Sequence, residues 1–92
     1  MFYLIAYDIS DTKKRNKVVK VLESYGYRVN YSVFELNLKA KELESITNTL
    51  KEYIDTNDSI RVYSFSADTI AKSYELNPKR SHPFELGANY VS

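Results

Sequence analysis

The sequence contains no cysteine and no tryptophan, and its 92 residues include one histidine, two glycines and two prolines. The missing cysteine excludes disulfide bonds and thiolate metal sites. No apolar run approaches the ~20 residues that a membrane-spanning helix needs. The apolar run at the N-terminus ends at Asp8, which is too early for a signal peptide. We therefore predict a cytoplasmic protein without a membrane partner.

The bulk composition is that of one small globular domain. Hydrophobic residues make up 43% of the chain, which is enough for an ordered core. The net charge of +1 hides a separation of sign along the sequence. Residues 10–30 carry six basic and two acidic side chains, whereas residues 31–58 carry three basic and six acidic ones. A concentrated run of cations favours a polyanionic partner.

The spacing of apolar residues predicts alternating strands and helices. The predicted elements are a strand at 2–8, a helix at 11–25, a strand-like segment at 27–38, a helix at 40–55 and a strand at 59–65. Because the third segment is long for one strand, we divide it by a tight reversal near Tyr31 and Ser32. The resulting order is βαββαβ, which is the ferredoxin-like α+β arrangement.

The first predicted helix has recognisable ends and a buried stripe. The stripe has i, i+4 and i+7 spacing and consists of Val18, Leu22 and Tyr25. Either Ser10 or Asp11 can cap the N-terminus, and Gly26 suits a left-handed position after the C-terminus.

The C-terminal part of the chain has a weaker pattern. We assign 1–65 to the ferredoxin-like core and 66–92 to an extension of the same domain. Within the extension we predict a short helix at 67–76, a loop at 77–83 and a final edge strand at 84–91.

The first predicted strand is apolar on both faces. Helices cover only one face of a ferredoxin-like sheet, so the other face needs a different cover. A second copy of the chain, packed sheet against sheet in a two-fold homodimer, is the cover we favour. The alternative is that residues 66–92 fold back over this face.

Asp8 stands at the C-terminal end of the first strand, next to a strongly basic helix start. Carboxylates are ligands of hard divalent cations, and phosphodiesters bind cationic side chains. The arrangement therefore indicates metal-assisted phosphate chemistry or nucleic-acid binding. The simpler alternative is that Asp8 only caps the following helix.

Two blocks of the sequence resemble the CRISPR-associated protein 2 family. The first is YDISD at 7–11 followed by RNKV at 15–18, and the second is RVNYSVFE at 28–35, in which the family usually has Gln instead of Asn30. The resemblance covers 1–65. It implies a small homodimer of the CRISPR adaptation machinery, which bridges dimers of the integrase subunit, CRISPR-associated protein 1, on foreign DNA. Several members are described as metal-dependent endonucleases on RNA or double-stranded DNA.

The resemblance also implies a site. It makes Asp8, one from each subunit, the catalytic carboxylate and the ligand of Mg²⁺ or Mn²⁺. Ser32 and Phe34 belong to the second block and would support this site, while Ser10 and Asp11 are better explained as helix-start residues. The candidate nucleic-acid contacts are Lys13, Lys14, Arg15, Lys17, Lys20 and Arg28.

Each of these cations also has a structural alternative. The lysines can form a solvated helix face, Arg15 can extend its charge from the apolar stripe into solvent, and Arg28 can pair with Glu35.

Several functions remain open at this stage. The leading hypothesis is a dimeric adaptor for spacer acquisition on a double-stranded prespacer, and the second is a Mg²⁺-dependent endonuclease acting on RNA or DNA. The alternatives are a VapD-like toxin endoribonuclease, a non-catalytic nucleic-acid-binding module and a metabolite-binding regulatory domain. The single histidine, His82, lies in a proline-flanked loop, so the sequence contains no obvious general base. That favours a structural role.

Overall fold

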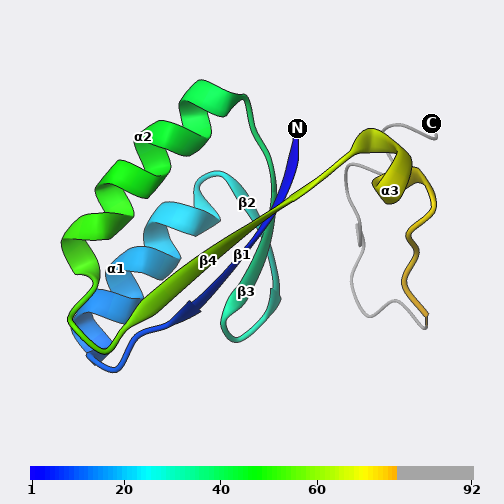
Figure 1. Cartoon of the computed structure of the whole chain (residues 1–92). Helices are drawn as coiled ribbons and strands as arrows, with labels where there is room; N and C mark the ends of the chain where they lie inside the picture. Colours follow the sequence, from blue (N-terminus) through cyan, green and yellow to red (C-terminus); the bar gives the residue numbers. More distant parts are fainter. Residues whose placement is uncertain (77–92) are drawn as a thin grey trace.

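The computed structural model describes residues 1–76, and the predicted loop at 77–83, strand at 84–91 and His82 lie outside this range. Figure 1 shows the order of the elements along the chain. They are β1 (Phe2–Asp8), α1 (Thr12–Glu23), β2 (Gly26–Asn30), β3 (Val33–Asn37), α2 (Ala40–Leu50), the 3-10 turn η1 (Lys51–Tyr53), β4 (Ser59–Phe65) and α3 (Ala67–Ala71). None of the helices in this part of the chain is both long and apolar enough to cross a bilayer.

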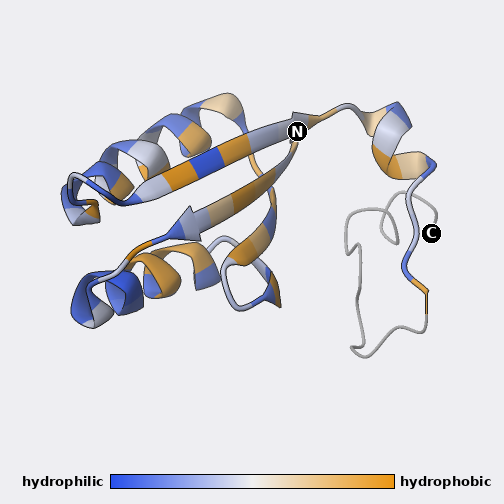
Figure 2. Cartoon of the chain, turned by 60° about the horizontal axis from the view of Figure 1, so that its bottom comes forward, coloured by the Kyte–Doolittle hydropathy of each residue, from blue (hydrophilic) through white to orange (hydrophobic). Residues whose placement is uncertain are grey.

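The four strands form one antiparallel sheet in the order β2-β3-β1-β4, with α1 and α2 packed on the same face (Figure 1). This arrangement confirms the predicted α+β fold and its βαββαβ order. The two helices lie side by side along the sheet and leave its opposite face open (Figure 2). The division into a core at 1–65 and an extension at 66–92 stays a prediction.

The core lies between the sheet and the two helices. Its buried members are Tyr3, Ile5, Tyr7, Ile9, Val18, Leu22, Phe34, Leu36, Leu38, Ile46 and Leu50. The predicted stripe is confirmed at Val18 and Leu22, which are buried. The prediction for Tyr25 is wrong, because α1 ends at Glu23 and Tyr25 lies beyond the helix with 46% of its surface exposed.

Gly26 has a different role from the one predicted. It is the first residue of β2, and its backbone is not in the left-handed region. A Cβ at this position would lie 2.5 Å from the carbonyl oxygen of Glu35 and 2.6 Å from Cγ of Leu36. Glycine is therefore required because strand β3 approaches so closely, and a larger residue would force the two strands apart.

Asp11 was one of two predicted caps of the first helix and is confirmed, whereas the ends of the second and third helices differ from the sequence prediction. Asp11 caps α1, because its carboxylate accepts a hydrogen bond of 2.9 Å from the backbone N–H of Lys14. The second helix ends at Leu50, and only the 3-10 turn continues to Tyr53. The short helix α3 ends at Ala71 rather than at residue 76.

The β2–β3 hairpin reverses at Tyr31 and Ser32, as predicted. The pairing places Arg28 opposite Phe34 but Asn30 opposite Val33, so the register shifts by a bulge just before the turn. Bulges of this kind bend a strand and redirect its side chains. The bulge is the feature that shapes the site described below.

Among residues 1–76, the cover of the open sheet face lies at one end. Phe2 is buried there beneath Ile70 of α3, and its ring meets that of Phe65 edge-on at 6.4 Å. Leu4 and Ala6, further along β1, stay half-buried, and Tyr63 on β4 is 43% exposed. The described part of the extension therefore covers Phe2 alone, and the homodimer stays a prediction.

Candidate functional site

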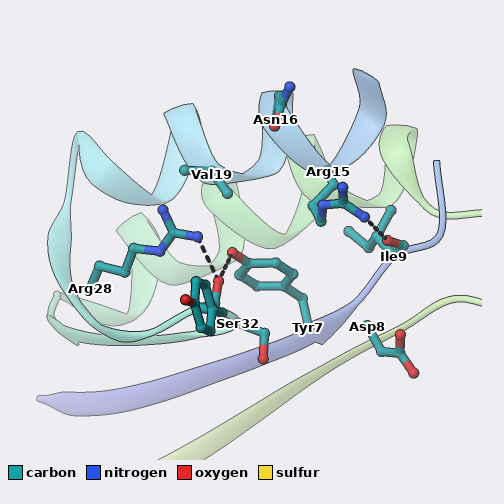
Figure 3. Close-up of a pocket in the computed structure, with 9 residues that line it drawn as sticks. Tyr7, Asp8, Ile9, Arg15, Asn16, Val19, Arg28 and Ser32 are labelled. Carbon is teal, nitrogen blue, oxygen red and sulfur yellow. Dashed lines mark hydrogen bonds between the residues drawn. The ribbon is translucent and has the colours of Figure 1, made fainter. Parts of the chain in front are cut away.

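A pocket of about 660 Å³ lies where β1 runs into α1, beside the β2–β3 turn (Figure 3). Its volume is within the ~300–1,000 Å³ range of ligand sites. The lining residues are Tyr7, Asp8, Ile9, Arg15, Asn16, Val19, Arg28, Tyr31 and Ser32. Both of the sequence blocks described above, at 7–18 and at 28–35, contribute lining residues. The fold therefore brings together two segments that are separate in the sequence.

The β2–β3 turn is fixed to β1 by hydrogen bonds that converge on one carbonyl. The hydroxyl of Tyr7 and Nη2 of Arg28 both donate to the carbonyl oxygen of Tyr31, at 2.6 and 2.7 Å. The backbone N–H of Tyr7 also donates to the carbonyl of Ser32 at 3.0 Å. The Arg28 guanidinium lies 5.9 Å from the centre of the Phe34 ring. Phe34 is therefore a core residue that also supports a cation of the site.

Arg15 closes the β1–α1 loop from the helix side. Its Nη1 donates to the carbonyl oxygen of Ile9 at 3.1 Å, and its Nη2 donates to the hydroxyl of Thr12 at 3.3 Å. These oxygens are neutral, so the hydrogen bonds orient the guanidinium without cancelling its charge. Arg15 is thus positioned by its neighbours and does more than extend along the apolar stripe.

Asp8 occupies the exposed end of β1, opposite Ser59 of β4. Its carboxylate points away from the guanidinium groups of Arg15 and Arg28 (Figure 3). Strand alternation explains this, because Tyr7 faces the helices and its neighbour faces the other way. The role of Arg15 as a nucleic-acid contact stays a prediction.

The fit of Asp8 to a metal rests on its donor chemistry. A solvent-exposed carboxylate suits Mg²⁺, which keeps several waters and uses only one or two protein carboxylates. Within residues 1–76, no three His, Cys, Asp or Glu side chains form a group that could hold a metal ion. Asp11 is used as the helix cap, so Asp8 is the residue of this segment that would hold the ion.

A second carboxylate, Asp58, holds the loop that follows Asp8. Its Oδ1 accepts from the backbone N–H and the hydroxyl of Ser10, at 3.1 and 3.2 Å. Its Oδ2 accepts from the backbone N–H of Asp55 at 2.8 Å. The hydrogen bond from Asp55, followed by those from Ser10, lowers the pKa of Asp58 below its usual value. Sequence reasoning missed Asp58, because 48 residues separate it from Ser10 and no local pattern marks it.

The six candidate cations face three directions. Nζ of Lys14 forms a 2.6 Å ion pair with Asp55, and Nζ of Lys17 lies 5.7 Å from the ring centre of Tyr53. The hydrogen bond with Asp55 raises the pKa of Lys14. Both lysines therefore face the turn that follows α2. The two arginines line the pocket, and Lys13 and Lys20 lie on the exposed, outward side of α1.

Asn16 connects the pocket with this outward side. It lines the pocket and is exposed, and it lies three residues after Lys13 and four before Lys20. On a helix, residues with these spacings are neighbours. Lys13 and Lys20 therefore lie next to the pocket on the surface of α1, whereas Nζ of Lys14 pairs with Asp55 and Nζ of Lys17 lies near the ring of Tyr53.

Comparisons with known proteins place the chain in a class of CRISPR-associated proteins. The family described as "CRISPR associated protein Cas2" matches residues 1–73. The CRISPR-associated endoribonuclease Cas2 3 of Chloroflexus aurantiacus is 52% identical over 64 residues, which cover 68% of this chain and 69% of that protein. The chain therefore belongs to the Cas2 family, as the sequence resemblance predicted.

Solved structures agree with this assignment. Streptococcus pyogenes Cas2 superposes with a TM-score of 0.72 and 31% identity, covering 84% of this chain and 100% of that one. A chain of a partial Cas6-RT-Cas1–Cas2 complex gives a TM-score of 0.62 and 35% identity, covering 83% and 90% of the two chains.

Proposed function

We propose that this protein is a dimeric nucleic-acid-binding subunit of CRISPR adaptation that assembles with the integrase subunit, CRISPR-associated protein 1. The similarity to a chain of a Cas6-RT-Cas1–Cas2 complex, over 83% of the present sequence, is the observation that carries this proposal. The family assignment favours it over the VapD-like toxin and over a metabolite-binding domain.

The open sheet face supports the dimer. Leu4 and Ala6 of β1 and Tyr63 of β4 lie on this face, because Leu4 pairs with Tyr63 and residues directly opposite share a side. A contiguous face of this kind needs a cover. A second copy packed against it would bury more than the ~1,000 Å² typical of a specific interface.

The outward cations support backbone-led binding of nucleic acid. Lys13 and Lys20 face solvent on the side of α1 adjoining the pocket arginines. Lysine and arginine on a helix surface bind phosphates and do not distinguish bases, so affinity should vary little with duplex sequence. It should fall steeply with salt, because each phosphate contact releases counterions.

The test combines assembly and salt dependence. The full chain is mixed with the integrase subunit and a prespacer duplex, and the mass of the complex is measured by light scattering. We expect a joint complex that contains the protein as a dimer. The Lys13→Ala/Lys20→Ala variant should reduce the slope of log affinity against log salt by about 0.9 per lost phosphate contact.

Lys72→Ala is the control, because Lys72 is exposed just after α3 and pairs with Asp68. A control slope equal to the wild type, together with a reduced slope for the α1 variant, supports the proposal. Equal slopes for all three proteins would mean that α1 does not face the nucleic acid. A stable monomer that does not bind the integrase would refute the adaptor role.

A second candidate function is metal-dependent phosphodiester hydrolysis at Asp8. It is favoured by the relatives named as endoribonucleases and by the exposed strand-end carboxylate. Asp8 would hold Mg²⁺ or Mn²⁺, together with Asp8 of a second copy. A bound ion of this kind polarises a phosphoryl oxygen and activates water. The substrate, RNA or double-stranded DNA, belongs to the same proposal.

A further inference from the structure

Tyr31 combines a fixed backbone with a freely exposed ring. Its carbonyl accepts hydrogen bonds from Tyr7 and Arg28 at 2.6 and 2.7 Å, and its N–H donates to Oδ1 of Asn30 at 2.7 Å. The residue is nevertheless 86% exposed, more than any other large hydrophobic residue in the described part of the chain. The turn therefore holds an aromatic ring in solvent at a defined place.

The surroundings of Tyr31 indicate which ligand would use this ring. Tyr31 lines the same pocket as Arg15 and Arg28, and Arg28 is hydrogen-bonded to the Tyr31 backbone itself. An aromatic face beside cations matches the two chemical parts of a nucleotide, namely a flat base and an anionic phosphate. Tyrosine suits this role because one ring supplies a large apolar face and a polar edge.

The other exposed tyrosines lack this combination. Tyr25 is 46% exposed at the opposite end of β2, Tyr63 is 43% exposed on β4, and Tyr74 is 76% exposed beyond α3. None of these three residues lines the pocket. The hydrogen bonds at the hairpin tip also mean that little additional order is required when a ligand binds. That lowers the entropy cost of association.

We propose that Tyr31 is a stacking platform for an unpaired base of single-stranded nucleic acid, with the neighbouring phosphates on Arg15 and Arg28. This inference rests on the proposed nucleic-acid function and defines the form of substrate that the pocket takes. Paired bases in a duplex hide both faces in the stack, whereas unpaired bases expose them. Tyr31 therefore selects single strands, loops or frayed ends, and it does so with little regard to base identity.

The first experiment measures affinity for a labelled single strand and for a blunt duplex of the same sequence. Tyr31→Ala should weaken single-strand binding roughly 5- to 150-fold and leave duplex binding unchanged. Tyr31→Phe keeps the ring and should bind like the wild type, whereas Tyr31→Leu keeps apolar bulk without an aromatic face and should resemble the alanine variant. Tyr25→Ala is the matched control and should have no effect.

The second experiment removes the base instead of the tyrosine. Single abasic positions are placed along the strand, and we expect one position to weaken wild-type binding by the same factor as Tyr31→Ala. The same abasic position should not weaken the alanine variant further, because both changes remove one contact. RNA and DNA strands are tested in parallel. The nucleic acid whose affinity falls more in Tyr31→Ala is the one that the site prefers.

The results separate this inference from the function it rests on. Wild-type affinity in Tyr31→Ala, with affinity still lost in Arg15→Ala, would overturn the stacking role and leave nucleic-acid binding intact. A wild-type protein that binds neither strand nor duplex would refute the proposed function itself. A change of oligomeric state in Tyr31→Ala would show that the ring contacts a protein, and that too would overturn the proposal.

Discussion

Tyr7 donates its hydroxyl hydrogen to the carbonyl oxygen of Tyr31 across 2.6 Å, and so joins the central strand β1 to the tip of the β2–β3 hairpin. The two residues are 24 positions apart in the sequence. The Tyr7 ring is buried and lies 6.3 Å from the ring of Phe34. One side chain therefore fills the core and sets the wall of the pocket.

We expect Tyr7→Phe to lower the free energy of unfolding by about 0.5–1.5 kcal/mol, the net contribution of one hydrogen bond. The loss stays moderate because Arg28 still donates to the Tyr31 carbonyl. Urea denaturation measures this difference. Tyr25→Phe removes an equivalent hydroxyl from an exposed ring and should have no effect; equal stability of both variants would show that the Tyr7 bond contributes nothing.

Periodicity was sufficient to predict the elements of this fold because each strand and helix has an apolar pattern of its own. The predictions failed at positions where contacts with neighbouring elements, and not the local pattern, determine the role of a residue. Gly26 follows a helix, which suggests a left-handed cap, but the close approach of Glu35 and Leu36 determines its role. Tyr25 has the right spacing for the stripe, yet α1 ends before it reaches that position.

The candidate site was predictable only in part, for the same reason. Asp8 follows from its place at a strand end, and this position needs no tertiary information. The contact of Asp58 with Ser10 depends on how the strand pair β1–β4 sets two loops together. The bulge between Arg28 and Asn30, which directs Arg28 to the Tyr31 carbonyl, has no glycine or other local signal.

Asp58 should make the stability of the protein depend on pH in the acid range. Its ordinary pKa is 3.8, and hydrogen bonds from Asp55 and Ser10 lower this pKa in the folded state. The stabilising contribution is therefore complete above pH 3.8 and is lost as the pH falls through the lowered pKa. Asp58→Asn should be less stable at neutral pH, and its acid unfolding should be shallower than that of the wild type.

Thermal melts between pH 2 and pH 7 test this expectation, with Asp68→Asn on α3 as the control. Asp68 is exposed and forms an ion pair with Lys72, the residue that follows α3. If the melting temperature of Asp58→Asn falls with decreasing pH as steeply as that of the wild type, the hydrogen bonds to Asp58 do not have the stabilising role assigned to them.

Glu35 should weaken the proposed dimer as the pH rises, whereas Asp58 destabilises the fold as the pH falls. It lies opposite Leu4 in the sheet register, so it is on the open face. Burial, and after it the charge of Glu75, raises the pKa of Glu35 above its ordinary 4.5. The ionised form is therefore penalised, and the penalty grows as the pH rises from 4.5 through the raised pKa. A second copy over this face would remove further water from the carboxylate.

The dimer dissociation constant should therefore increase with pH in the wild type, whereas Glu35→Gln should dimerise equally well at each pH. Sedimentation between pH 4.5 and pH 8 measures both, and Glu44→Gln on the exposed side of α2 is the control. Dimerisation of the wild type that does not change with pH would argue that the open face is covered in another way.

Asp8→Asn separates the two candidate functions of the protein. The amide keeps the size of the side chain but loses the charge that holds a hard cation. We expect the variant to lose Mg²⁺-dependent cleavage of RNA or DNA, while the proposed dimer and its complex with the integrase persist, because Asp8 is exposed at the end of β1 and is not part of the buried core. Wild-type cleavage should increase with pH, because a divalent cation held by Asp8 would lower the pKa of a bound water and so favour hydroxide at higher pH.

The decisive measurement is spacer acquisition in cells that carry only the Asp8→Asn protein. We expect normal acquisition, because in the proposed function the protein would bridge the integrase through the surface of its dimer and would not need hydrolysis. If acquisition were lost while the complex stayed intact, cleavage and not assembly with the integrase would be the primary function. Cleavage that survives in highly purified Asp8→Asn protein would show that the metal is held elsewhere or that the activity comes from a contaminant.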